Sequence, residues 1–389
     1  MNVEQAIIVC GGLGSRLGKI TKKTPKPLLK VENTTVLEHI IKNLSRFGIK
    51  EILLLCGYKQ ELFKKKFNNK IIFGIKIKCV IEKKLLGTSG ALYNAKKFLK
   101  KTFLFCNADT FFDININDLV NNFFVKKKFI AFIALKQVLH KNKRYDYFKF
   151  TKKNFLVFAK KKKFNLVNSG FCIFSNKIIK YLVKEGSLEK DVFPKLTNKK
   201  LISGKKYNNE FIDMGTIKDL KRLPKFLKRK NFKPALFLDR DGVINKDIGY
   251  LYKKKDFVWR KNIINFIKKF NNKNYYVFVI TNQSGVGRGY YKKEDVINLH
   301  SWINQNLQAN GANIDEFFFS PFYKDSKIKK YRKDKIMRKP NIGMIKAAQK
   351  KWSIDLKKSL LIGDNLSDKQ TAINAGIRYK ILKFQSYLK

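Results

Sequence analysis

Acidic residues are scarce in this chain. Its 389 residues include 29 Asp and Glu against 85 Lys and Arg, which gives a formal net charge of +56. Such an excess often indicates a polyanion partner. Here the lysines are scattered through both halves in short runs, such as residues 64–66 and 160–163, as in a lysine-rich protein from an AT-rich genome. The charge therefore indicates compositional drift, attraction of anions, or both.

Paired cysteines and long apolar runs are also missing. The five cysteines are Cys10, Cys56, Cys79, Cys106 and Cys172, and none of them forms a C-x-x-C pair. Reduced, buried thiols in a cytosol are the plain interpretation. No apolar run reaches the ~20 residues needed to span a bilayer, and no secretory signal opens the chain. We expect a cytoplasmic protein that inserts into no membrane and binds no nucleic acid, because no aromatic RNA-binding motif accompanies the charge.

No internal repeat is visible, and the length suits two ordinary domains. Hydrophobic residues make up 44% of the sequence, which is enough for two cores. Strand-like runs, glycine loops and helical patterns alternate, which predicts an α/β fold in which each domain is a mostly parallel sheet covered by helices. The expected domains are residues 1–222 and 234–389, joined by a basic linker at 223–233 that follows a terminal helix.

The expected elements of both halves follow from these patterns. Expected strands lie at 6–10, 51–56, 77–81, 102–106, 235–238, 276–280 and 359–362. Expected helices lie at 36–47, 89–99, 263–270, 292–307 and 341–352.

A glycine-rich segment follows the first expected strand. Gly11, Gly12 and Gly14 allow backbone N–H groups to approach a phosphate, and Arg16 can hold two phosphate oxygens. A glycine loop alone is also compatible with a structural turn. The segment is not a P-loop, because the G-K-[ST] ending is missing.

The surroundings of this segment are more specific. Residues 24–28 read T-P-K-P-L, and together with the glycines they resemble the G-G-x-G-x-R-L…P-K-P-L signature of nucleotidyltransferases that make nucleotide sugars. Five further segments resemble motifs of that family, at residues 86–91, 107–110, 168–170, 187–191 and 211–216.

The resemblance implies transfer of a nucleotide from a nucleoside triphosphate to a sugar 1-phosphate, a reaction that depends on positioning and charge neutralisation. Asp109 and Asp213 would supply oxygen ligands to Mg²⁺, and Arg16 and Lys26 would hold the triphosphate. The alternative for Asp109 is a helix cap.

Other substrate contacts are implied by the same family. Gly87 and Thr88 would lie against the nucleotide base, and Asn168 would contact the sugar. Lys161 matches the family's sugar-phosphate lysine, although it lies within a lysine run. Glu82 could pair with N1–H and N2–H₂ of guanine, but related enzymes for other bases also carry an acidic residue nearby, so the base stays open.

A pair of aspartates marks the second half. Asp239 and Asp241 follow an apolar strand, and Gly242 permits a sharp turn. Carboxylates in this arrangement can face one phosphate, the first as nucleophile and metal ligand, the second as general acid and metal ligand. A calcium loop would need a later glutamate that is missing.

Three more pieces follow in order. Thr281 and Asn282 offer donors for phosphate, Arg338 and Lys339 offer two cations, and Asp364 offers a metal-binding carboxylate. The ordered set resembles haloacid dehalogenase superfamily phosphatases. It is most similar to their heptose 1,7-bisphosphate phosphatase and histidinol-phosphatase branch, which also shares the G-Y and R-G pieces at residues 249–250 and 288–289.

Members of that branch often carry a Cys/His zinc cluster before R-K-P. Here Ser320, Phe322, Lys335 and Met337 stand at the apparent ligand positions, and no cysteine lies beyond Cys172. Four ligands cannot be assembled, so we expect Mg²⁺ in both domains and no zinc. The loop 323–337 must be held in another way, or be mobile.

The two resemblances imply consecutive reactions. The phosphatase would remove the 7-phosphate of a heptose 1,7-bisphosphate, and the transferase would couple the heptose 1-phosphate to GTP, giving GDP-heptose for surface polysaccharide. The alternatives are the same chemistries on another sugar or nucleotide, or one active domain fused to a degenerate regulatory domain. The oligomeric state does not follow from the sequence.

Overall fold

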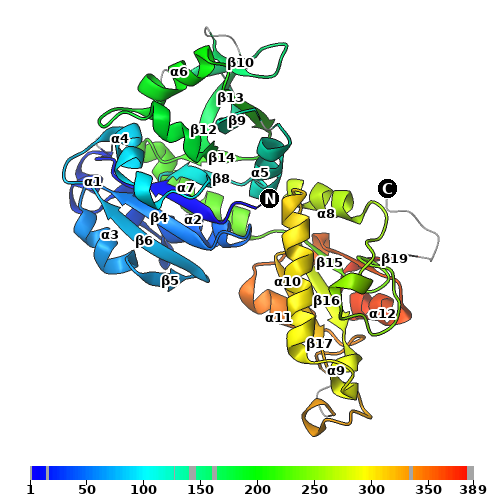
Figure 1. Ribbon diagram of the computed structural model, residues 1–389. Helices are drawn as coiled ribbons and strands as arrows, with labels where there is room; N and C mark the ends of the chain where they lie inside the picture. Colours follow the sequence, from blue (N-terminus) through cyan, green and yellow to red (C-terminus); the bar gives the residue numbers. More distant parts are fainter. Residues whose placement is uncertain are drawn as a thin grey trace. The chain divides into compact units, whose positions relative to one another are not determined.

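The computed structural model describes residues 2–14, 17–126, 128–139, 146–159, 164–332 and 336–382. The chain divides into two compact units, Met1–Phe226 and Leu227–Lys389, and each is described here by itself (Figure 1). Both units are sheets flanked by helices, which confirms the expected α/β class. Within the described residues, no helix combines the length and apolarity needed to cross a membrane.

The first unit is built on a mixed sheet with the order β11-β10-β12-β7-β1-β4-β6-β5. The centre is parallel and consists of β7 (Thr102–Asn107), β1 (Gln5–Val9), β4 (Glu51–Cys56) and β6 (Ile75–Ile81). The long β12 (Phe164–Ser175) runs antiparallel to β7 and also pairs with β9 (Ala131–Leu139). The remaining sheet strands are β5 (Lys70–Ile72), β10 (Tyr147–Phe150), β11 (Leu156–Phe158) and β13 (Ile202–Tyr207).

Two small strand pairs complete the β-structure described for this unit. Strand β8 (Thr110–Phe112) pairs antiparallel with β14 (Phe211–Asp213), and β2 (Lys30–Val31) pairs with β3 (Thr34–Thr35). The helices are α1 (Lys19–Lys23), α2 (Val36–Ser45), α3 (Gln60–Phe67), α4 (Gly87–Asn94), α5 (Ile116–Val125), α6 (Phe193–Asn198) and α7 (Ile217–Asn231).

Local sequence explains the start of α2. The Thr35 hydroxyl accepts from Glu38 N at 3.3 Å, and the Glu38 carboxylate accepts from Thr35 N at 2.7 Å, which is a capping box. Val36, Leu37, Ile40, Ile41 and Leu44 are buried at helical spacing.

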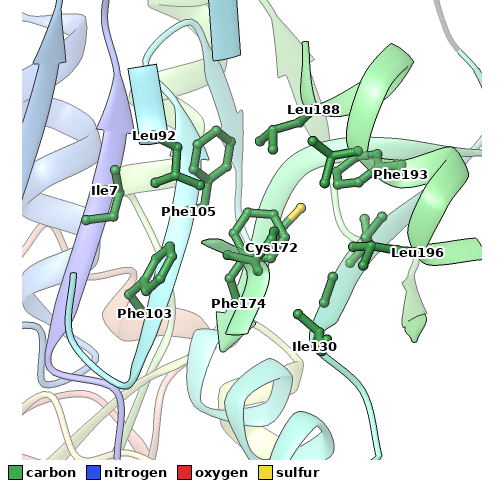
Figure 2. Packing of buried hydrophobic residues seen from close by; sticks show 14 of the residues in the cluster. Ile7, Leu92, Phe103, Phe105, Ile130, Cys172, Phe174, Leu188, Phe193 and Leu196 are labelled. Atoms are coloured by element: carbon green, nitrogen blue, oxygen red, sulfur yellow. The ribbon is translucent and has the colours of Figure 1, made fainter. Parts of the chain in front are cut away.

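The core of the first unit lies between this sheet and its helices. Ile7 of β1 and the phenylalanines of β7 pack on Leu92 of α4 and on β12, as Figure 2 shows. Phe174 makes an edge contact with Phe103, with ring centroids 5.9 Å apart. Leu188, Phe193 and Leu196 extend the cluster on the other side (Figure 2).

Helix α7 continues through most of the segment expected to be a linker at 223–233. Pro224 lies inside the helix, while Leu223 and Leu227 are almost fully buried. Irregular backbone begins only after Asn231, directly before the first strand of the second unit.

The second unit is a parallel sheet with the order β17-β16-β15-β18-β19. Its strands are β15 (Ala235–Leu238), β16 (Tyr276–Asn282), β17 (Glu316–Ser320), β18 (Leu360–Gly363) and β19 (Arg378–Ile381). Its helices are α8 (Ile263–Asn272), α9 (Ser284–Arg288), α10 (Lys293–Ala309), α11 (Gly343–Lys351) and α12 (Leu366–Asn374).

Strand β15 shows why both faces of this sheet are covered. Leu236 and Leu238 pack with α8 and α10, whereas Ala235 and Phe237 pack with α11 and α12. Side chains of a strand alternate between faces, so an uninterrupted apolar strand requires helices on both sides. From β15 the strand order runs outward to β16 and β17 on one side and to β18 and β19 on the other. In parallel sheets of this kind, ligands usually bind at the carboxyl ends of the strands at such a switch point.

Candidate active sites

A cavity of about 390 Å³ opens at the carboxyl ends of β1 and β7 in the first unit. It is lined by residues 9–14, Lys26, Pro27, Glu82, Leu85, Gly87, Thr88 and residues 107–109. The structure therefore brings Gly11, Gly12 and Gly14 together with most of the other residues expected to bind the nucleotide. Arg16 and Lys161 lie outside the described residues.

Two glycines are required by the backbone of this cavity. Gly14 has a φ of +68°, and a Cβ there would lie 2.9 Å from Cε of Lys26. Gly87 has a φ of +74°, and a Cβ would lie 2.3 Å from the carbonyl oxygen of Gly186. Larger residues would therefore displace Lys26 or separate α4 from the segment that it contacts.

Three ionisable side chains line the cavity, those of Lys26, Glu82 and Asp109. The Lys26 side chain is almost fully buried, and its Nζ lies 3.7 Å from Oδ2 of the half-buried Asp109. In the β8–β14 register Asp213 is opposite Thr110, one residue from Asp109. Asp109 directly precedes β8 and Asp213 ends the neighbouring β14, and the carboxylate oxygens of these two residues suit a hard cation such as Mg²⁺.

Glu82 is buried in the cavity wall with 5% of its surface exposed. Its Oε2 accepts from Leu86 N at 3.2 Å, whereas Oε1 has no hydrogen-bond partner among the described residues. Burial raises the pKa of this carboxyl, and the Leu86 N–H partly opposes the rise. A buried acceptor without a partner favours a ligand that brings an N–H or O–H donor.

Thr88 and Asn168 have contacts within the protein. The Thr88 hydroxyl donates to Glu189 at 3.2 Å and accepts from Leu188 N at 2.8 Å, so it joins α4 to the segment before α6. Asn168 Oδ1 accepts from Gly170 N at 2.9 Å within a bulge of β12. These bonds give both residues a structural role alongside any contact with a ligand. Glu189 belongs to the segment 187–191 that resembles a family motif, but its contact with Thr88 was not predicted.

The second site lies at the carboxyl end of β15. Asp239 is buried with 7% of its surface exposed, and Lys339 Nζ lies 2.7 Å from its Oδ2. Lys339 also donates to Asp368 Oδ1 at 2.6 Å. Burial raises the pKa of Asp239 to about 7, although the Lys339 charge opposes this. Burial alone would lower the pKa of Lys339, but the charges of Asp239 and Asp368 outweigh it and raise that pKa.

Three carboxylates converge here. Asp239, Asp364 and Asp368 each place an oxygen within 4.8 Å of the others, which fits a hard divalent cation. Burial, and after it the Asp368 charge, raise the pKa of Asp364. A Cβ at Gly242 would lie 1.8 Å from Asp364 Oδ2, so glycine is needed for this approach. The sequence did not identify Asp368 as a member of this group, although it lies one helical turn after Asp364.

The Asp241 carboxylate faces other partners. Nη2 of the fully buried Arg240 donates to both oxygens of Asp241 at 2.9 Å. The side-chain amides of Gln283 and Asn245 also donate to the Asp241 carboxylate, at 2.8 Å and 3.0 Å respectively. Arg240 in turn donates to Leu251 O at 2.7 Å. Asp241, expected as acid and metal ligand, is therefore held beside the group of three carboxylates and is not part of it.

The remaining expected residues surround this centre. Asn282 Nδ2 donates to Lys339 O at 3.2 Å and Asn282 Oδ1 accepts from Lys339 N at 3.0 Å, which fixes the lysine that contacts Asp239. Thr281 accepts from the Gln283 amide at 3.0 Å. Arg338 donates to Phe322 O at 3.0 Å, and burial lowers its pKa.

Hydrogen bonds order the described part of the loop that lacks zinc ligands. The buried Ser326 hydroxyl lies 2.6 Å from Gly287 O and accepts from Ile328 N at 3.1 Å. Arg332 Nε donates to Ser326 O at 2.6 Å, and Tyr323 N donates to Tyr331 O at 3.0 Å. Lys335, one of the four positions compared with zinc ligands, lies outside the described residues.

Comparisons with known proteins identify relatives of both units. Residues 5–230 match the family model for nucleotidyl transferases, and residues 237–381 match the model for polynucleotide kinase 3 phosphatase. The second unit is 43% identical over 141 residues to D-glycero-alpha-D-manno-heptose-1,7-bisphosphate 7-phosphatase of Photorhabdus laumondii, covering 36% of this chain and 77% of that protein.

The first unit has similar relatives. It is 35% identical over 219 residues to D-glycero-alpha-D-manno-heptose 1-phosphate guanylyltransferase of Campylobacter jejuni, covering 55% of this chain and 96% of that protein. Among solved structures, HddC from Yersinia pseudotuberculosis is 25% identical with a TM-score of 0.50, covering 58% of this chain and 99% of HddC.

Fold, sites and matches together define a bifunctional enzyme, with a nucleotidyltransferase unit followed by a phosphatase unit. The chain belongs to the nucleotidyl transferase family through its first unit and to the family of the heptose-1,7-bisphosphate 7-phosphatases through its second.

Proposed function

We propose that the chain catalyses two consecutive steps of nucleotide-sugar synthesis in the cytoplasm. The second unit removes the 7-phosphate of D-glycero-D-manno-heptose 1,7-bisphosphate, and the first unit couples the heptose 1-phosphate to GTP, giving GDP-heptose and pyrophosphate. One observation carries this proposal. The two units of one chain are similar to two different enzymes, a heptose-1,7-bisphosphate 7-phosphatase and a heptose 1-phosphate guanylyltransferase. The phosphatase reaction yields heptose 1-phosphate, which is the substrate of the guanylyltransferase reaction.

Hydrolysis begins at Asp239. Its carboxylate attacks the phosphorus atom, an aspartyl phosphate forms, and the sugar hydroxyl leaves. Asp241 donates a proton to the leaving oxygen and then accepts one from the water that cleaves the aspartyl phosphate. Lys339, 2.7 Å from Asp239, aligns the nucleophile and balances the charge of the phosphate oxygens. Thr281 and Asn282 lie at the end of the neighbouring strand, where they complete the phosphate pocket.

Nucleotidyl transfer needs no protein nucleophile. An oxygen of the sugar 1-phosphate attacks the α-phosphorus of the nucleoside triphosphate, and pyrophosphate leaves. Room for the triphosphate along the cavity wall comes from Gly11, Gly12 and Gly14. The ammonium group of Lys26 offsets the negative charge of the departing pyrophosphate. Arg16 and Lys161 remain proposed contacts to the triphosphate and to the sugar phosphate.

Both sites offer oxygen ligands for Mg²⁺. Asp109 and Asp213 would hold it in the first unit, and Asp239, Asp364 and Asp368 in the second. Bound there, Mg²⁺ would neutralise phosphate oxygens. No zinc is proposed, because the sequence between Phe317 and Lys339 contains neither Cys nor His.

Selection of guanine is assigned to Glu82. N1–H and N2–H₂ of guanine are adjacent donors that a carboxylate can accept from together. Two observations support this pairing: Glu82 Oε1 has no hydrogen-bond partner in the described part of the chain, and Glu82 lies in the cavity wall. Uracil and thymine present a single ring N–H between two carbonyl oxygens. One oxygen of Glu82 could accept from that N–H, while the other would have no donor or would face a carbonyl oxygen that repels it.

The test uses the wild-type chain with Mg²⁺. Phosphate release is measured on heptose, hexose and pentulose bisphosphates, and nucleotide-sugar formation is measured by chromatography with each nucleoside triphosphate and the matching sugar 1-phosphate. The expected best substrates are heptose 1,7-bisphosphate and GTP. A clear preference for another sugar or base would overturn the assignment of substrate and leave the two reaction classes in place. Absence of one activity in the folded chain would contradict the two-step proposal.

A further inference from the structure

Arg240 is a buried cation whose contacts reach beyond the motif in which it lies. It directly follows the nucleophile Asp239, and its side chain is fully buried. Nε donates to Asp241 Oδ1 at 3.1 Å, and Nη2 donates to both Asp241 oxygens and to Leu251 O. These bonds use two of the three guanidinium nitrogens, so the donors on Nη1 need an acceptor elsewhere in the protein.

His300 lies at that third nitrogen. It belongs to α10, is 4% exposed, and its Nε2 lies 3.5 Å from Arg240 Nη1. The imidazole ring also stacks on Phe317 of β17, with ring centroids 4.5 Å apart and an angle of 19° between the planes. The two contacts together fix the position and the plane of the ring.

The chemistry of the two groups sets the direction of this contact. A guanidinium has only N–H donors, so Nε2 of His300 must present its lone pair and the imidazole proton must lie on Nδ1. Burial, and after it the Arg240 charge, hold the pKa of His300 well below its ordinary value. The ring is therefore a neutral acceptor near neutral pH and places no second charge beside Arg240.

The Asp241 carboxylate is held by this set of contacts and by a second one. Its Oδ2 also accepts from the Gln283 amide at 2.8 Å, and Gln283 Oε1 accepts from the Tyr291 hydroxyl at 2.9 Å. Proton transfer to a leaving oxygen depends steeply on the placement of the acid. A carboxylate fixed from two sides is suited to that task.

We propose that His300 is a positioning residue for proton transfer in the phosphatase. Through Arg240 it fixes the direction of the Asp241 carboxylate toward the leaving oxygen, and it does not contact the substrate. The inference rests on the proposed phosphatase function, in which Asp239 takes the phosphoryl group while Asp241 gives its proton to the sugar oxygen as the P–O bond breaks. It assigns a role to a buried imidazole that neither proposed reaction uses.

The experiment compares two leaving groups that need the acid to different degrees. A sugar alkoxide needs a proton in order to leave, whereas p-nitrophenolate leaves without one. His300→Phe keeps a ring to stack on Phe317 and removes the acceptor. We expect its kcat/KM to fall about tenfold on heptose 1,7-bisphosphate and by less than about twofold on p-nitrophenyl phosphate. Because kcat/KM ends at phosphoryl transfer to Asp239, the later hydrolysis of the aspartyl phosphate does not enter the comparison.

Two further variants separate the acceptor from the stability of α10. His300→Gln places an amide oxygen near the position of Nε2, so it should restore most of the kcat/KM on the bisphosphate. Gln308→Leu is the matched control, because it removes a buried hydrogen bond of the same helix, to Asn313 Oδ1 at 3.1 Å. It should leave the ratio of the two kcat/KM values unchanged.

The tautomer supplies a test that needs no substrate. Nitrogen NMR of the wild-type chain, isotope-labelled in its three histidines, should show His300 with an unprotonated Nε2 and a protonated Nδ1. Loss of the signal in His300→Gln assigns it. A protonated Nε2 or a charged ring would overturn the inference.

The outcomes separate the inference from the function on which it rests. A wild-type chain that releases phosphate from neither compound would contradict the proposed function, and the NMR spectrum would still test the contact between His300 and Arg240. With an active wild type, equal losses on both substrates in His300→Phe, or no loss on either, would overturn the inference alone. A loss on the bisphosphate that His300→Gln does not restore would also overturn it.

Discussion

The two units place phosphate chemistry at the carboxyl ends of parallel strands, but they surround it differently. In the first unit the ionisable side chains in the wall of the glycine-lined cavity of about 390 Å³ are those of Lys26, Glu82 and Asp109. In the second, three carboxylates crowd within 4.8 Å around a buried lysine. A transferase must hold two substrates while one attacks the other, whereas a phosphatase must hold its own nucleophile ready.

The charged groups of each site depend on whether the substrate or the protein supplies the nucleophile. Where the substrate supplies it, the protein provides space, backbone N–H groups and a counter-charge. Where the protein supplies it, the nucleophile must be oriented in a buried site, which needs a partner such as Lys339 to offset the cost of burying Asp239.

The largest expected effect comes from removing the nucleophile. Asp239→Asn should lower phosphatase activity by on the order of 10⁴-fold or more, because it replaces the carboxylate that forms the acyl phosphate by an amide. Nucleotidyl transfer, assayed on purified heptose 1-phosphate, should stay near the wild-type rate. A folded variant that loses both activities equally would show that the two sites are not independent.

Asp109→Ala and Asp213→Ala probe the other side of the comparison. Each removes a proposed Mg²⁺ ligand, so pyrophosphate release should fall about a hundredfold or more while phosphatase activity persists. The exposed Asp146→Ala is the matched control. Full pyrophosphate release at ordinary Mg²⁺ concentrations would mean that other carboxylates hold the metal.

Asp368→Asn sharpens the account of the crowded site. Lys339 would lose its partner at 2.6 Å, and the acidic group would lose one member, so phosphatase activity and apparent Mg²⁺ affinity should fall about ten- to hundredfold. Asp256→Asn, an exposed change in the same unit, serves as control. Unchanged Mg²⁺ dependence would remove Asp368 from the metal site.

The smallest effect concerns the loop without zinc ligands. Ser326→Ala removes a hydroxyl that bonds to Gly287 and Ile328, so we expect stability to fall by about 1–3 kcal/mol, measured by denaturant unfolding. A zinc-selective chelator should change neither stability nor phosphatase activity. One tightly held zinc per chain by elemental analysis would contradict this expectation.

The sequence predicted most of the local structure that carries chemistry. Patterns of apolar residues located the central strands, and the glycines and Asp239 stand where those strands end. The short β17 and β19 were not anticipated. Neither were β9 and β13, because their pairings depend on segments far apart in the chain.

Some site contacts could not be predicted because they are non-local. Lys339 meets Asp368 across 29 positions, and Thr88 meets Leu188 across 100. Arg240 was part of a recognised motif, but its complete burial and its pairing with Asp241 depend on the fold of residues up to Leu251. Periodicity and motifs carry no information on such pairs.

We propose that one chain performs two reactions in series at independent sites. The direct measurement follows heptose 1,7-bisphosphate, GTP and Mg²⁺ by phosphorus NMR with Asp239→Asn, with Asp109→Ala, and with an equal mixture of both. We predict that the first variant leaves the bisphosphate intact, the second accumulates heptose 1-phosphate, and the mixture forms GDP-heptose. A mixture that forms no GDP-heptose, or an Asp239→Asn chain that forms it alone, would contradict the account.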